Sequence, residues 1–309
     1  MAFTAQDVKQ LREMTTVGMM DCKKALQATD GDMDKAVDWL REKGLAKAAK
    51  KADRIAAEGV AYATVVNGVG VVIEVNSETD FAAKTDAFMD LVKNLAVAVA
   101  EQNPADVEAL KACTYPGSNL TVTEIMQEKV MSIGENMQIR RFVRFPENTS
   151  VAYVHAGGTH GVLVNLAVEG DIDVTEMGKN VAMQIAAMNP KYWDKDQVPQ
   201  ADVDKEMADQ VALMDNDPKM ASKPAQVKEK IAAGKMAAFY KEQCLLQQEF
   251  VRGDLFKGDV AGYIAAAAQQ LGGKVTFVGA VHFVKGEGIE KKVDDFAAEV
   301  AAQVAGAAK

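Results

Sequence analysis

A β-hairpin pattern occurs twice in the chain, 91 residues apart. Val60-Ala61-Tyr62 matches Val151-Ala152-Tyr153, and Gly70-Val71-Val72-Ile73 matches Gly161-Val162-Leu163-Val164, both without gaps (151 − 60 and 161 − 70). A helical pattern of apolar residues follows each copy, over residues 85–100 and 174–188. Two valine-rich hairpins can also look alike by chance, because strands favour the same residue types. Two copies are too few for a solenoid, so the pattern predicts an α+β fold with a duplicated core, in which each subdomain is an antiparallel sheet covered by helices.

The first hairpin has a clear turn signal. Residues 60–66 and 69–76 are rich in β-branched side chains and flank Asn67-Gly68, the pair that best suits a type I′ turn. Val71, Ile73 and Val75 are expected to point inward, since strand side chains alternate between faces. A last strand is predicted over residues 274–284 and is assigned to the second subdomain.

The first 44 residues are predicted to form a docking head of three short helices. Thr4 is placed to cap the first helix, which carries Val8, Leu11 and Met14 on one face, and Gly44 is expected to end the third. Residues 45–57 favour helix but carry few apolar side chains. The head is therefore expected to be separate from the core and joined to it by a mobile helical linker.

The remaining segments are helical. Residues 202–250 carry two narrow apolar stripes, interrupted by Pro218 and Pro224, and this predicts an inserted antiparallel helical hairpin or coiled coil that projects from the core. Its predicted inward residues are Val203, Met207, Val211 and Met214 on one helix and Val227, Ile231 and Phe239 on the other. The predicted domains are the head at 1–44, the linker at 45–58, the first core subdomain at 59–145, the second at 146–201 and 251–292, the hairpin at 202–250 and a C-terminal helix at 293–309.

Charge and cysteine content limit the class of protein. The formal net charge of -9 works against tight binding to nucleic acid, which depends on clustered lysine and arginine. The three cysteines fit neither a disulfide framework nor a zinc pattern, and no apolar run approaches the ~20 residues that cross a bilayer. We expect a cytoplasmic protein that binds neither membrane nor nucleic acid directly.

Sequence patterns for bond chemistry are absent. No phosphate-binding G-x-x-x-x-G-K-[ST] loop occurs, and His155, His160 and His282 lack the neighbouring ligands of a recognisable metal site. We predict no catalytic residue, no metal and no cofactor. Two other classes stay open: a ribosome-associated RNA scaffold that uses the head and the basic linker, and an enzyme that uses the His155–His160 loop.

The segment 76–84 ends a strand and starts a helix, and its residues alone allow two interpretations. Ser77 or Thr79 can cap the helix while Glu78 and Asp80 favour its N-terminus and Phe81 enters the core. Alternatively, Phe81 projects beyond the sheet and binds a partner.

Three separated stretches resemble the bacterial elongation factor Ts family. They are residues 8–26 (VKQLREMTTVGMMDCKKAL), 74–81 (EVNSETDF) and 284–291 (VKGEGIEK), with weaker matches at 134–141, 153–155 and 229–236. Together with the order of the domains, the resemblance covers essentially the whole chain. It implies a UBA-like head and a guanine-nucleotide exchange factor rather than an enzyme.

The resemblance also implies a partner and contact residues. The partner is elongation factor Tu with GDP bound or without nucleotide; Thr79, Asp80, Phe81 and Ala82 form the motif that helps dislodge its magnesium ion, so that GDP leaves and GTP can bind. Arg12, Met19 and Met20 of the head, and His155 of the second subdomain, are expected at the interface. Ala82 and His160 depart from the family pattern, in which larger aliphatic residues are usual.

Overall fold

The computed structural model describes residues 3–15 and 17–290. Its helices are α1 Ala5–Thr15, α2 Met19–Ala28, α3 Met33–Lys51, α4 Asp80–Ala83, α5 Asp86–Gln102, α6 Val107–Ala112, α7 Val122–Ile133, α8 Thr175–Met188, α9 Gln200–Asn216, α10 Ala225–Gln243 and α11 Val260–Leu271. Its strands are β1 Glu58–Val66, β2 Val69–Ser77, β3 Met137–Phe145, β4 Thr149–His155, β5 His160–Glu169 and β6 Lys274–Val284. Three short 3₁₀ turns are η1 Ala156–Gly158, η2 Lys195–Gln197 and η3 Leu245–Gln247. In these residues no helix is both long and apolar enough to cross a membrane.

The first sheet is antiparallel with the strand order β1-β2-β3. Asn67 and Gly68, which join β1 to β2, both have positive φ values, 50° and 83°, as a type I′ turn requires. The hairpin is therefore formed as predicted. Because β2 is the central strand, it is buried on both faces.

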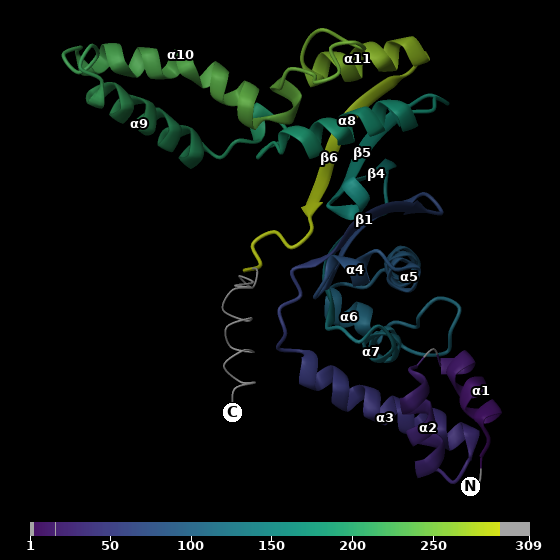
Figure 1. Ribbon diagram of the computed structural model, residues 1–309. Coiled ribbons are helices and arrows are strands. Elements are labelled where there is room, and N and C mark those ends of the chain that lie inside the picture. Colours follow the sequence, from purple (N-terminus) through teal and green to yellow (C-terminus); the bar gives the residue numbers. More distant parts are fainter. Residues whose placement is uncertain (1–2, 16, 291–309) are drawn as a thin grey trace, which may run out of the picture.

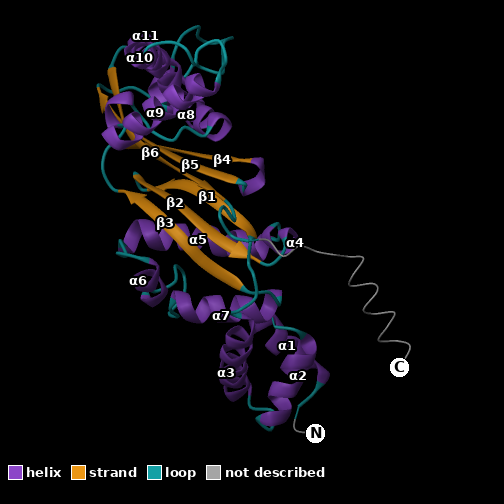
Figure 2. Cartoon of the chain, turned by 90° about the vertical axis from the view of Figure 1, so that its left-hand side faces the viewer, coloured by secondary structure: helices purple, strands orange, loops and turns teal. Residues whose placement is uncertain are grey.

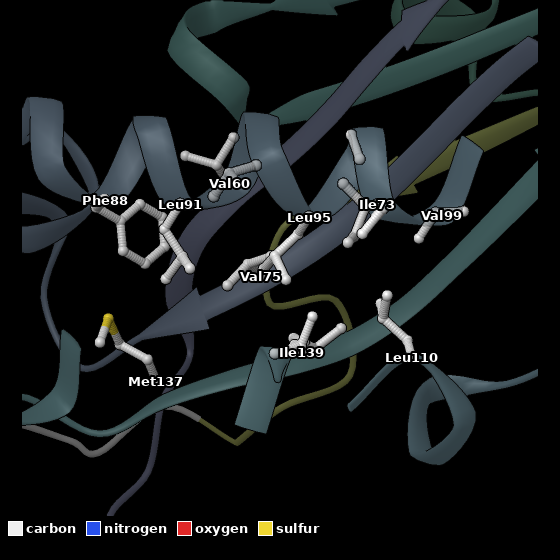
Figure 3. Close-up of a cluster of buried hydrophobic side chains, with 14 of the residues drawn as sticks. Val60, Ile73, Val75, Phe88, Leu91, Leu95, Val99, Leu110, Met137 and Ile139 are labelled. Carbon is white, nitrogen blue, oxygen red and sulfur yellow. The ribbon is translucent and has the colours of Figure 1, made fainter. Parts of the chain in front are cut away.

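The main core lies between this sheet and α5, which Thr85 caps by accepting a hydrogen bond from the amide of Phe88. Val71, Ile73 and Val75 of β2 belong to the same apolar cluster as the helix, as predicted. Figure 3 shows Ile73 and Val75 between the strand and α5. The apolar face of α5 is built from fully buried side chains at helical spacing, namely Phe88, Leu91, Val92, Leu95 and Val99. Each such burial stabilises the fold by about 1.5 to 3 kcal/mol.

The second sheet repeats the first, with the order β4-β5-β6 and α8 packed against it. β5 pairs with β4 and β6 as β2 pairs with β1 and β3. The register shifts between Glu74 and Val75 in one sheet and between Asn165 and Leu166 in the other, an offset of 91 (165 − 74). The α+β class and the two antiparallel sheets are confirmed, and the match between the two copies extends to an irregularity in pairing.

The two sheets stack on each other between outer layers of helices (Figure 2). Their contact is a small apolar cluster that includes Val72, Leu163 and Phe283. Gly70 and Gly161, the equivalent residues of the repeat, face the opposite sheet: a Cβ on Gly161 would lie 2.9 Å from the Ala61 carbonyl, and one on Gly70 would lie 2.4 Å from the Ser150 hydroxyl. The absence of a side chain at these two positions lets the sheets approach.

The head differs from the prediction in how it joins the core. Its three helices have their own apolar cluster, but α3 does not end at Gly44 and continues to Lys51. Gly44 lies against α7, where a Cβ would come within 2.4 Å of the Met131 sulfur, and Arg41 pairs with Glu128 of α7 at 3.4 Å. The glycine thus allows helix–helix contact instead of ending a helix. The head is therefore not joined to the core through the predicted linker alone. The prediction of helix up to Ala57 is wrong, because residues 52–57 follow the end of α3 as turns and irregular chain.

Helices α9 and α10 extend together from the second sheet (Figure 1). The buried side of α10 consists of Lys228, Ala232 and Met236, not of the predicted Val227, Ile231 and Phe239. The alanine lets the helices approach, and the Lys228 ammonium is neutralised by Asp215 of α9. The helix also ends at Gln243, seven residues before the predicted end (250 − 243), so that Leu245 and Phe250 enter the core under the second sheet. The predicted C-terminal helix at 293–309 lies outside the described residues.

Candidate functional site

The segment after β2 forms a four-residue helix, α4. Thr79 has extended backbone angles and is its N-cap, and the Thr79 hydroxyl accepts a hydrogen bond from the amide of Ala82 at 3.2 Å. The next residue after α4, Lys84, is followed by a second N-cap, Thr85, which starts α5. Two caps close together therefore produce a short projecting turn between the strand and the long helix.

Phe81 lies on the solvent side of this turn and is 80% exposed, whereas its neighbours Ala82 and Ala83 are buried. The interpretation that puts Phe81 in the core is wrong. Ala82, predicted as part of the same motif, lies beneath Phe81 against the sheet, so of the four predicted motif residues only Thr79, Asp80 and Phe81 have accessible side chains. A buried small residue at this place lets the turn sit close to the sheet.

Asp80 precedes Phe81 and pairs with Lys84 across α4, with 2.6 Å between carboxylate and ammonium. The hydrogen bond from Lys84 lowers the pKa of Asp80, so this carboxylate is charged at neutral pH. The exposed aromatic ring therefore stands beside a negative charge.

Two carboxylates connect this turn to the start of β3: Glu78, which the sequence placed at the helix N-terminus, and Glu135, which the sequence analysis did not single out. Glu135 accepts hydrogen bonds from the amide and the hydroxyl of Thr79, at 2.9 and 2.6 Å. Glu78 accepts a hydrogen bond from the amide of Asn136 at 2.6 Å. We call this reciprocal pair of contacts the carboxylate bracket. Its residues lie in two of the family-like stretches, 74–81 and 134–141, but neither stretch by itself indicates that the two segments are in contact.

A buried ion cluster lies further back on β2. The carboxylate of Glu74 is inaccessible to solvent and accepts hydrogen bonds from Arg140 at 2.9 Å, from Arg141 at 2.6 Å and from the amide of Gly286 at 2.7 Å. Burial by itself would raise the pKa of Glu74, but these bonds and one from Asn76 outweigh it and hold the pKa below its ordinary value. We call this group the Glu74 clamp. It joins residues of two of the three family-like stretches, 74–81 and 284–291, through two arginines of β3.

The predicted head residues are also at the surface. Arg12 is exposed on α1, and Met19 and Met20 are 50% and 65% exposed at the start of α2. Met14, expected on the buried face of α1, is instead 56% exposed, so the prediction of its burial is wrong.

His155 stands at the end of β4 in a row of four neighbouring rings, of which two pairs are hydrogen-bonded. Its Nδ1 lies 2.8 Å from the Tyr153 hydroxyl; further along, Nδ1 of His160 lies 3.0 Å from Nε2 of His282. Burial, followed by the neighbouring His160, lowers the pKa of His282 to about 4. In the part of the chain that the structure describes, no three His, Cys, Asp or Glu side chains are arranged to hold a metal ion.

The predicted site residues therefore occupy three separate places: the head, the turn at α4, and the end of β4 (Figure 1). The structure does not bring these groups into one pocket. Such an arrangement suits an extended surface that meets a large partner, because a small substrate is bound in a single concave site.

Comparisons with known proteins identify the family of the chain. Residues 78–287 match the sequence model of a family described as Elongation factor TS. The chain is 43% identical over 309 residues to Elongation factor Ts of Magnetococcus marinus, covering 99% of this chain and 100% of that protein. It is 44% identical to Elongation factor Ts of Syntrophotalea carbinolica (97% and 99% covered) and 46% identical to that of Trichlorobacter lovleyi (98% and 98%). The chain therefore belongs to the elongation factor Ts family of translation elongation factors.

Proposed function

We propose that this protein is the guanine-nucleotide exchange factor of elongation factor Tu, and that Phe81 is the wedge that enters the partner. The observation that carries the proposal is the 80% exposure of Phe81 on a turn whose other apolar residues are buried. Aromatic rings are costly to leave in water, and they are enriched among the residues that dominate binding energy.

The mechanism is thermodynamic linkage. An exchange protein that binds nucleotide-free elongation factor Tu more tightly than the GDP-bound form must also weaken GDP binding. The affinity for GDP falls by the same ratio by which GDP lowers the affinity for the exchange protein. Displacing the ligands of the partner's magnesium ion exposes the phosphates' charge, which loosens GDP and allows GTP to bind. Such a protein acts in the cytoplasm, is not an enzyme, and needs no cofactor of its own.

The head and the second sheet supply further contacts in this proposal. Arg12 and the exposed methionines of a UBA-like head dock on the nucleotide-binding domain, while His155 faces another domain of the partner. The tyrosine at 2.8 Å orients the His155 ring. Helices α9 and α10 form the antiparallel coiled-coil hairpin, which carries none of the proposed contacts.

The test is release of a fluorescent GDP from purified elongation factor Tu, with the wild-type protein and with Phe81→Ala. Loss of an aromatic anchor typically costs ~2 to 4 kcal/mol of binding, or roughly thirty- to a thousand-fold in affinity. The half-saturating concentration of the variant should rise accordingly. Chelation of Mg²⁺ should shrink the stimulation by wild-type protein, because release without the factor is then already fast.

Leu213→Ala is the matched control, because Leu213 is also an exposed apolar residue, 61% accessible, but lies on α9. It should exchange GDP like the wild type. No stimulation by the wild-type protein would refute the proposed function, and normal stimulation by Phe81→Ala would refute the role of the ring.

A further inference from the structure

We infer that Glu135 is a positioning residue for exchange, which holds Phe81 in its projecting orientation through Thr79. The inference rests on the proposed function, because it assigns a role to the wedge. It starts from the length of α4: four residues are too few to form a stable helix without outside support, since even isolated helices of 12 residues are marginal.

The support comes from the carboxylate bracket. The Thr79 hydroxyl donates a hydrogen bond to Glu135 at 2.6 Å, which leaves its lone pairs free to accept from the amide of Ala82, 3.2 Å away. The same carboxylate holds the Thr79 amide at 2.9 Å. Glu135 thus fixes both the backbone of the N-cap and the direction of its hydroxyl, and hydrogen bonds in such a chain strengthen one another.

The bracket is itself anchored in the rigid part of the molecule. The Asn136 amide donates to Glu78 at 2.6 Å, and the Asn136 side chain, almost fully buried, donates to the carbonyl of Arg54 at 2.8 Å. Met137, the next residue, is buried in the main core. Because Glu135 directly precedes this anchored segment, its carboxylate has a fixed position from which it can orient the turn.

The chain contains the same pair of hydrogen bonds at a place remote from Phe81. In the capping box of α7, Glu124 accepts from the amide and the hydroxyl of Thr121, at 2.7 and 2.8 Å. Glu124→Ala removes equivalent contacts without touching the turn at α4. It is therefore the control for a general effect of losing a capped helix.

The experiment compares Glu135→Ala, Glu135→Gln and Glu124→Ala in two assays. In the free protein, amide hydrogen exchange over residues 79–83 should become about fivefold faster in Glu135→Ala, the loss expected when a partly exposed hydrogen bond to a charged group is removed. Glu135→Gln, which keeps one acceptor, should lie between Glu135→Ala and the wild type. Glu124→Ala should leave this region unchanged.

In the GDP-release assay, Glu135→Ala should slow stimulated release by about fivefold, for the same reason. In the Phe81→Ala background, Glu135→Ala should add less than about twofold, because a residue that acts through Phe81 has no further effect once the ring is gone. Full additivity, or an equal effect of Glu124→Ala, would overturn the inference.

The two assays separate the inference from the proposed function. If the wild-type protein fails to stimulate GDP release, the proposed function fails, while the hydrogen-exchange result still reports whether Glu135 holds the turn. If stimulation is normal but residues 79–83 keep their protection in Glu135→Ala, the inference alone is refuted.

Discussion

The Glu74 clamp offers a quantitative test of what holds the two sheets and the segment after β6 together. Glu74→Gln keeps the shape of the side chain but removes the charge that four N–H donors share. A hydrogen bond to a charged group exceeds a neutral one by about 1 kcal/mol, so four bonds suggest a loss of about 4 kcal/mol. Arg140 and Arg141 are 27% and 33% exposed, so water can replace part of the hydrogen bonding that they lose. We therefore expect Glu74→Gln to lower the free energy of unfolding by about 2 to 3 kcal/mol.

The assay is thermal unfolding followed by circular dichroism. A loss of this size should lower the melting temperature by about 4 to 12 °C. The control is Glu169→Gln, which breaks the Glu169–Lys274 ion pair of 2.9 Å, whose side chains are both 70% exposed. That change should cost no more than about 0.5 kcal/mol, because exposed ion pairs contribute little.

The dependence on pH gives the refuting result. The folded-state pKa of Glu74 lies below its ordinary value, so the stability it contributes is present above that ordinary value and is lost as the pH falls through the lowered pKa. The difference between wild type and Glu74→Gln should be constant from pH 7.5 to about 5 and should shrink below about 4.3. Equal melting temperatures at pH 7.5, or a difference at pH 3 as large as the one at pH 7.5, would refute the reasoning.

Two further predictions concern the head and the histidine row. Gly44→Phe should destabilise the protein by about 1 to 3 kcal/mol in urea unfolding, because the ring needs the space of Met131, and adding Met131→Ala should recover part of the loss; no recovery would mean that the two side chains do not compete. His282 has a folded-state pKa of about 4, below its ordinary value of about 6.5, so the unfolded chain takes up the proton first and stability is lost as the pH falls from 6.5 towards 4. Wild-type protein should lose about 1 to 2 kcal/mol from this group between pH 7.5 and 5, and His282→Gln should lose less; parallel pH profiles of the two proteins would contradict this assignment.

The features that local chemistry determines could be predicted from the sequence. Asn67-Gly68 suits only a narrow set of turns, and the alternation in β2 assigns Val71, Ile73 and Val75 to one face. The strand at residues 274–284 was predicted with its observed bounds for the same reason. Such signals need no knowledge of the rest of the chain.

Features that depend on distant residues were missed. A glycine near the end of a helical pattern usually marks its end, but Gly44 lies inside α3, where Met131, 87 residues away (131 − 44), occupies the space that a side chain would need. On α10 the apolar pattern favours Val227 and Ile231, whereas the paired carboxylate of Asp215 allows Lys228 to be buried instead. Periodicity does not reveal such compensation.

The position of Phe81 depends on both kinds of information. Capping chemistry predicts that a helix starts near Thr79, but the cap can form whether the Phe81 ring lies in the core or in solvent. The side is decided by Ala82 and Ala83, which occupy the surface of the sheet beneath the turn. The resemblance to the family, rather than any local rule, favoured the exposed position.

The turn at α4 must be ordered before the partner arrives if Phe81 is to contribute affinity. Fixing the backbone costs about 1 to 2 kcal/mol per residue, so ordering its four residues during binding would cost about 4 to 8 kcal/mol. Phe81 is expected to return only ~2 to 4 kcal/mol, and the ring would then give no net affinity. Glu74 is fully buried and Phe81 is 80% exposed, so the segment is anchored at its base and presents its ring to solvent at its tip. The clamp and the carboxylate bracket already order the turn in the free protein, so its conformational entropy is lost during folding and not during binding. The contact energy of the ring then contributes in full to displacing GDP.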